Sequence, residues 1–194
     1  DGKILVGGGI ETWAGPASNL VRLHPDGTRD MSFDPGTALW SDYGGVQQLA
    51  LHTDGRILVG GDFNTAHGIR CLMPDGSVDP LFTIGSGFSI ATTTTMLSIS
   101  SLIPQADGRI LMTGMFDSFN GTPTPGIVRL HADGSLDITF NPGTGPSEQI
   151  RCAALQANGD LIIGGDFHAY DGIGRNHLAR VRGTDGNGIT DRAV

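Results

Sequence analysis

Short apolar segments separated by Asp-Gly or Asn-Gly turns recur along the chain. The clearest example is the segment DGRILVGG at Asp54–Gly61. Its Ile-Leu-Val run has the length and residue types of a β-strand, and Asp-Gly favours the tight hairpin turn that precedes it. Versions of this segment begin at residues 1, 54, 107 and 158, a spacing of 53, 53 and 51 residues. This near-constant spacing identifies an internal repeat.

A second segment alternates with the first and ends in its own Asp-Gly turn. It reads IVRLHADG at Ile127–Gly134, and a short tail with a Phe, such as ITFNPG at Ile138–Gly143, follows it. The other copies of the second segment are Leu20–Gly27, Ile69–Gly76 and a longer, degraded copy at Leu178–Gly186, and the other tails are Met31–Gly36 and Pro80–Gly85.

One unit is best described from residues 46–97. Strands are predicted at 46–52, 56–63 and 69–73, and a fourth strand is predicted to follow the second turn and end near Phe82. The paired glycines after the second strand indicate a bulge or a close backbone approach. Each unit is therefore predicted to be a four-stranded antiparallel meander of about 50 residues.

The four units form one predicted repeat domain. Their approximate bounds are 1–45, 46–97, 98–149 and 150–194. The first unit lacks its first strand because the repeat motif already begins at residue 1, so we expect the chain to be a fragment of a longer protein.

Such units cannot bury both faces alone, so neighbouring copies must stack. Four-stranded repeats of this length predict an all-β, β-propeller-like fold. An open β-solenoid or array of the same units is the alternative.

Composition agrees with a turn-rich β protein, since 31 of the 194 residues are Gly and only Glu11 and Glu148 among the 20 acidic residues are Glu. The net charge of −8 disfavours nucleic-acid binding. The apolar runs are too short for membrane insertion. Cys71 and Cys152 occupy non-equivalent positions in different units, so we do not expect them to pair.

The repeated segments resemble the delta-60 repeat family. The resemblance is strongest at 107–143 and 158–180, and it departs in the first unit, where Gly9-Ile10 replaces the family's Asp-Phe. It covers nearly the whole chain. It implies a propeller-like module of a secreted or surface protein of bacteria, at an extracellular or cell-surface location. The family has no assigned catalytic residues, so the resemblance implies a scaffold or binding surface.

The loop after the second strand is the first candidate site. Trp13, Phe119 and Tyr170 each stand two residues before the Gly that closes this loop. Aromatic rings beside acidic residues, here Asp62 and Asp166, suit a sugar ring. The alternative is that the aromatic rings pack one unit against the next, and that the two aspartates bond backbone N–H groups of the following turn.

The second candidate site is a calcium loop at the end of the chain. Asp185, Asn187 and Asp191 place oxygen-bearing side chains at spacings that can wrap Ca²⁺. The alternative is a hairpin turn equivalent to Asp133-Gly134.

Two further arginines occupy equivalent strand positions. Arg22 and Arg129 are predicted on a polar strand face, where they pair with aspartates of a neighbouring unit.

The leading functional hypothesis is a non-catalytic binding or scaffold module that presents its loops to a protein or glycan surface. One alternative is a polysaccharide-acting hydrolase or lyase. Another is a structural subunit that self-assembles into a surface filament or array, since the incomplete first unit can accept a strand from elsewhere.

Overall fold

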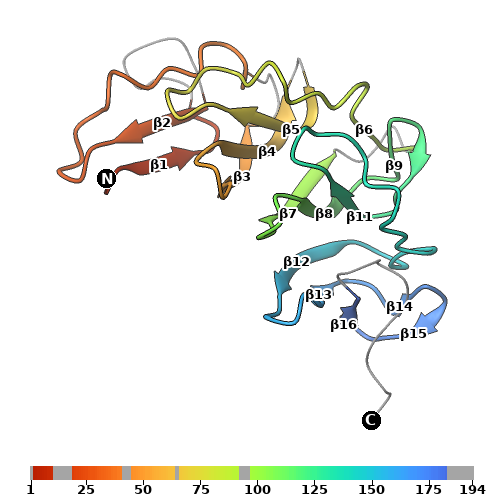
Figure 1. Ribbon diagram of the computed structural model, residues 1–194. Coiled ribbons are helices and arrows are strands. Elements are labelled where there is room, and N and C mark those ends of the chain that lie inside the picture. Colours follow the sequence, from red (N-terminus) through yellow and green to blue (C-terminus); the bar gives the residue numbers. More distant parts are fainter. Residues whose placement is uncertain (1, 11–18, 41–44, 64–65, 92–96, 183–194) are drawn as a thin grey trace.

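The computed structural model describes residues 2–10, 19–40, 45–63, 66–91 and 97–182, and these residues contain strands and turns but no helix (Figure 1). The main sheets follow the repeat, and all of their strand pairs are antiparallel. Their strands are, unit by unit, β1 (Ile4–Gly7) and β2 (Leu20–Leu23); β3 (Val46–Leu51), β4 (Ile57–Phe63) and β5 (Ala66–Leu72); β7 (Ser98–Pro104), β8 (Ile110–Met115) and β11 (Ile127–Leu130); β12 (Ile150–Leu155), β13 (Leu161–Gly165) and β16 (Leu178–Val181).

Short strands form two smaller sheets at the loops. One sheet has the order β10-β9-β6 and the other pairs β14 with β15. Their bounds are β6 (Phe88–Ser89), β9 (Ser118–Phe119), β10 (Thr122–Pro123), β14 (Ala169–Tyr170) and β15 (Ile173–Gly174).

The predicted fourth strand is wrong in the first three units, and its position in the fourth unit lies outside the described residues. In the third unit, only the single bridge between Leu130 and Leu136 follows the second turn. The chain then turns again, because the Asp137 carboxylate accepts the backbone N–H of Thr139 at 3.0 Å and prevents an extended continuation. The same bridges join Leu23 to Arg29 and Leu72 to Val78.

The sheets follow one another along an arc, with the β1–β2 sheet at one end and the sheet of β12, β13 and β16 at the other (Figure 1). First strands of neighbouring units contact each other, β3 with β7 and β7 with β12. The sheets are therefore stacked like the blades of a propeller, as the repeat predicts.

The apolar core consists of three clusters, and each lies between two units. In the cluster between the third and fourth units, Leu111 and Ile127 of one sheet pack against Leu161 and Ile163 of the next. The other two clusters join the first unit to the second and the second to the third in the same way. Each core cluster of the described residues is therefore shared by two units.

The second glycine of each pair lies against a bulge in the first strand, and Gly114 occupies its position in the third unit, where Thr113 replaces the first glycine. In the third unit the register of β7 on β8 shifts between Ile99 and Ser101. A Cβ atom at Gly114 would lie 2.0 Å from the carbonyl oxygen of Ser98, which no side chain can tolerate. Gly61 and Gly165 face the carbonyl oxygens of Gly45 and Gln149 in the same way, at 2.2 and 2.1 Å.

The bulged residues also connect neighbouring units. The Gln47 side-chain oxygen accepts the backbone N–H of Ile99 at 2.7 Å, and the Ser100 hydroxyl donates to the carbonyl of Ile150 at 2.7 Å. The bulge therefore aims one side chain per unit at the backbone of the next first strand.

Both cysteines are free thiols, in agreement with their predicted lack of pairing. Cys71 is buried in the core, and burial raises the pKa of its thiol to about 11. Cys152 is exposed. Within the described residues there is no helix of the length and hydropathy that a membrane span requires.

We expect Gly114→Ala to lower the free energy of unfolding by about 1–3 kcal/mol, because the new methyl group forces β7 away from β8. Gly174→Ala is the matched control, since a Cβ there meets open space, and we expect a change within about 0.5 kcal/mol. Urea unfolding followed by tryptophan fluorescence measures both. Equal effects of the two substitutions would show that the close approach at Gly114 is unimportant.

Candidate functional site

The densest cluster of charged side chains is built around one buried aspartate in each of the first three units. We call these the hub aspartates: Asp30, Asp79 and Asp137. In Asp137, Oδ1 accepts the backbone N–H and the hydroxyl of Thr139, at 3.0 and 2.6 Å. This oxygen therefore fixes the turn that replaces the predicted fourth strand.

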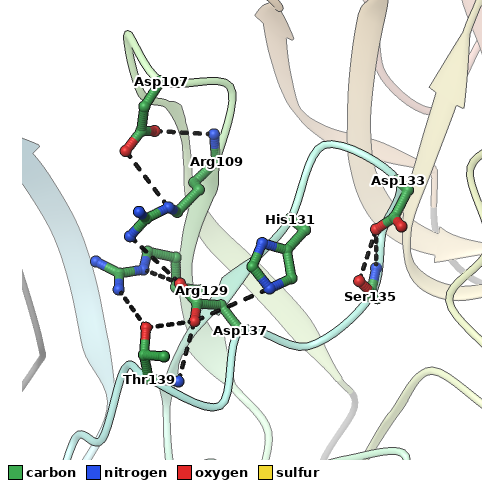
Figure 2. Close-up of polar contacts among 8 residues, drawn as sticks. All are labelled: Asp107, Arg109, Arg129, His131, Asp133, Ser135, Asp137 and Thr139. Atoms are coloured by element: carbon green, nitrogen blue, oxygen red, sulfur yellow. Dashed lines mark hydrogen bonds and ion pairs between the residues drawn. The ribbon is translucent and has the colours of Figure 1, made fainter.

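The second oxygen of the hub aspartate binds cationic side chains from the second and third strands (Figure 2). Asp137 Oδ2 lies 2.7 Å from Arg129 Nε and 3.5 Å from Arg109 Nη1, while His131 lies at 4.0 Å from the other oxygen. In the other units, Asp30 binds Lys3 and Arg22 at 2.8 and 2.7 Å, and Asp79 binds Arg56 at 2.7 Å.

The predicted polar face for Arg129 is wrong, because Arg129 is one of the largest fully buried side chains in the described residues. Its guanidinium also lies over the Phe140 ring, 4.9 Å from the centroid. Arg22 has the same arrangement with Phe33, at 4.7 Å. Both arginines pair with the aspartate of their own unit rather than a neighbour's. The constant spacing of eight residues, Arg22 to Asp30 and Arg129 to Asp137, was the sequence signal for this pairing.

Electrostatics keep the hub aspartates ionised. Burial by itself would raise the pKa of Asp137, but the hydrogen bonds from Thr139 and the Arg129 guanidinium lower it to about 2. Hydrogen bonds from Lys3 and Ser32 hold the pKa of Asp30 well below its usual value. Burial of Asp79 raises the pKa of its carboxyl, but the backbone N–H of Leu81 and the Arg56 guanidinium outweigh this effect, so the pKa is lowered.

Related side chains connect one unit to the next. Arg56 Nη2 donates to the carbonyl of Ala132 at 3.1 Å. The His52 ring nitrogen Nε2 lies 3.0 Å from the carbonyl of Gly108, and Arg22 donates to the carbonyl of Pro74. The charged groups of these clusters thus stabilise the turns within a unit through ion pairs and connect neighbouring units through hydrogen bonds.

The two described aromatic residues of the predicted loop site are fully buried. Phe119 packs edge-on against Phe88 of the preceding unit, with ring centroids 4.9 Å apart. Tyr170 lies in the core between the third and fourth units and forms a bridge with Pro146, and its burial raises the pKa of its hydroxyl. Neither ring is exposed to bind a sugar. Both instead pack one unit against the next, which is the alternative given above.

The two predicted aspartates of that site lie at the end of their second strands. Asp62 is in β4, opposite His67. Asp166 binds Arg151 at 2.7 Å in an exposed ion pair, so its carboxylate is used by the first strand of its own unit rather than by the following turn.

A cavity of about 180 Å³ opens at this end of the sheets and is lined by residues 114–117, 125–126 and 146–149 of the third unit. Its walls carry the carboxylates of Asp117 and Glu148. Asp117 accepts the backbone N–H of Ala91 at 2.7 Å, and Ser147 accepts those of His168 and Ala169 at 3.0 and 3.1 Å. The other lining residues are Gly114, Met115, Phe116, Pro125, Gly126, Pro146 and Gln149. This cavity could not be predicted from the repeat pattern, because its walls come from three segments of the third unit that are separated in the sequence.

The remaining predicted site residues lie outside the described part of the chain. These are Trp13 and the calcium-loop residues Asp185, Asn187 and Asp191. Among the described residues, no group of three or more His, Cys, Asp or Glu side chains is arranged to hold a metal ion. The calcium loop stays a prediction.

The repeating sheets, stacked through apolar faces and joined at their bulges, define a β-propeller repeat protein. A family model described as "Domain of unknown function (DUF5122) beta-propeller" matches residues 1–33, 52–82, 105–140 and 156–187. These segments make up more than half of the chain, and the chain belongs to this family. No curated protein matches it in sequence.

Stability should fall in acid as Asp137 is protonated. Its pKa is lower in the folded chain, about 2, than its usual 3.8, so its contribution is complete above pH 4 and is lost as the pH falls toward 2. The shift corresponds to about 2 kcal/mol. We expect Asp137→Asn to flatten the dependence of the unfolding free energy on pH in this range. NMR titration of the Asp137 carboxyl carbon measures the same pKa directly, and a midpoint near 4 would contradict the proposed ionisation.

We expect Arg129→Met to lower the free energy of unfolding by about 3–5 kcal/mol, because it leaves Asp137 buried without its nearest cation. Arg151→Met is the matched control, since it removes an arginine from an exposed pair with Asp166 and should cost about 0–1 kcal/mol. Denaturant unfolding compares the two variants. A similar cost for both would mean that burial of the Arg129 pair has no special weight.

Proposed function

We propose that the chain is a non-catalytic binding and scaffold module, which presents the loop ends of its sheets to a protein or glycan surface. The observation that carries this proposal is the cavity beside Glu148, which lies at the end of the third unit where residues 146–149 lead into β12. Sites of this kind suit a module whose frame is rigid and whose loops differ from unit to unit.

The protonation states of the hub aspartates favour binding over catalysis. General acid–base catalysis needs a group whose pKa lies near the working pH. The surroundings of Asp30, Asp79 and Asp137 instead lower the pKa of each carboxyl. Such groups remain ionised and hold the frame together.

The chemistry of the cavity indicates the kind of group that it accepts. Asp117 and Glu148 offer carboxylate oxygens, which accept hydrogen bonds from hydroxyl or ammonium groups. The cavity is smaller than the roughly 300 Å³ at which pockets for drug-sized molecules begin. A single sugar unit or one basic side chain of a protein partner suits this space.

The setting that we propose follows from the sequence resemblance. The repeat is of the delta-60 type, and the module belongs to a secreted or cell-surface protein of bacteria. Loop contacts outside the cell would then be its role, either as a binding surface or as a support for other parts of the protein.

An NMR titration tests the binding role. The ¹⁵N-labelled chain is titrated separately with neutral disaccharides and with a short lysine-rich peptide. We expect one of the two probes to shift the amide signals of Gly114, Asp117, Gly126 and Ser147, which line the cavity. Glu148→Gln should weaken that binding roughly tenfold, because it removes a charged acceptor.

Asp160→Asn is the control for this titration, because it removes the same charge at the opposite ends of the strands, where Asp160 accepts a hydrogen bond from Asn158. It should leave the affinity unchanged. Release of shortened products from a polysaccharide would instead favour the hydrolase or lyase alternative. Absence of shifts at the cavity with both probes would contradict the proposal.

A further inference from the structure

Two histidine rings lie side by side at the loop end of the fourth unit. His168 follows β13 after a short connection, and His177 directly precedes β16. Their ring centroids are 4.9 Å apart and their planes meet at 68°. The repeat places these residues at the positions of Asp117 and Gly126 in the third unit. The histidine pair is therefore specific to the fourth unit and is no part of the common frame.

Backbone hydrogen bonds hold both histidines in place. The N–H of His177 donates to the carbonyl of Phe167 at 2.8 Å, and the N–H of Gly165 donates to the carbonyl of His177 at 3.1 Å. Ser147 Oγ accepts the N–H of His168 at 3.0 Å. Both rings thus project from backbone that is already ordered, which lowers the entropic cost of forming a binding site there.

The backbone of His177 has a left-handed conformation. Its φ is +64°, and the equivalent residues Asn19 and Gly126 have φ values of +54° and +68°. Besides Gly, this conformation is found chiefly for Asn, Asp and His. In this position His177 Nδ1 lies 3.0 Å from the carbonyl oxygen of Gly165. Because a carbonyl oxygen only accepts, Nδ1 donates this bond, and Nε2 of the neutral ring keeps its lone pair.

This arrangement is the one that metal-binding histidines use. Such a histidine donates one ring N–H to a backbone carbonyl or carboxylate, which fixes the ring and leaves the other nitrogen for the metal. Two imidazoles on one ion, at metal–nitrogen distances of about 2.0–2.1 Å and a near-tetrahedral angle, have ring centres roughly 5 Å apart. The observed separation of 4.9 Å matches this value. Within the described residues no hydrogen bond or ion pair holds the His168 ring, so it can turn a nitrogen toward Nε2 of His177.

We propose that His168 and His177 together bind one late first-row transition-metal ion, with water in the remaining coordination positions. Imidazole nitrogen suits Zn²⁺, Ni²⁺ and Cu²⁺, whereas Ca²⁺ and Mg²⁺ prefer oxygen ligands. Among these ions Cu²⁺ should bind most tightly. The net charge of −8 favours the approach of any cation. Neither histidine lines the cavity beside Glu148, so this site does not rest on the binding role proposed above.

Isothermal titration calorimetry with Zn²⁺ in a buffer containing excess Mg²⁺ tests the proposal. The Mg²⁺ competes for sites made of carboxylates, so the remaining heat reports binding to imidazole. We expect the tightest Zn²⁺ site to hold one ion per chain. His168→Asn and His177→Asn should each weaken this binding by at least about tenfold, because each removes one of the two protein ligands. Asn at residue 177 suits the left-handed backbone, as Asn19 does in the first unit, and thermal unfolding without metal checks that both variants are folded.

His131→Asn is the matched control. It removes an imidazole whose side chain is 49% exposed but which lies in the third unit, beside Asp137. It should bind Zn²⁺ like the unaltered chain. NMR of the unaltered chain gives a second measurement, since Zn²⁺ should shift the ring signals of His168 and His177 together and leave those of His24 and His131 in place.

Unchanged affinity in both His168→Asn and His177→Asn would overturn the proposal. Loss of binding in His131→Asn, or ring shifts at His24 or His131 before those of the pair, would overturn it as well, since the ion would then lie elsewhere. The same conclusion would follow if Zn²⁺ produced neither heat nor ring shifts.

Discussion

Apolar contact between neighbouring units is the interaction on which the rest of the structure depends. A three-stranded sheet cannot bury both of its faces alone, and each core cluster of this chain is shared by two units. The sheets must therefore stack closely and in register. The glycines near the end of each second strand admit the bulged first strand of the same sheet, because a Cβ atom there would collide with its backbone. The bulge in turn aims Gln47 and Ser100 at the next unit.

The hub aspartates fix the turn by which the chain passes from one unit to the next. After the bridge that follows its second turn, the chain must reverse without a further strand. One oxygen of Asp137 fixes that reversal through Thr139, while the other is neutralised by Arg129 and Arg109. A buried carboxylate is costly unless it is paired. The arginine that pairs it also covers the Phe140 ring, so one cluster joins the turn, the strands and the core.

The repeat period and the hairpin turns could be predicted from the sequence, because Asp-Gly and apolar runs act over a few residues. The fold class followed from their number. The fourth strand was predicted wrongly because its residues have strand-like composition, while the competing turn depends on a buried Asp137 carboxylate that Arg129 and the more distant Arg109 neutralise. The burial of Phe119 and Tyr170 depends on the neighbouring unit and was left open. The cavity beside Glu148 could not be predicted because its walls come from three segments that are separated in the sequence.

The fourth unit separates apolar stacking from the charged cluster. Where the other units have Lys3, Arg56 or Arg109, it has Asp160, which accepts a hydrogen bond from the Asn158 side chain instead. A cation that helps to neutralise the hub aspartate elsewhere is therefore absent from this position. The apolar face that packs on the third unit is nevertheless kept, with Leu161 and Ile163 fully buried. Stacking of this face thus does not depend on a cation at the start of the second strand.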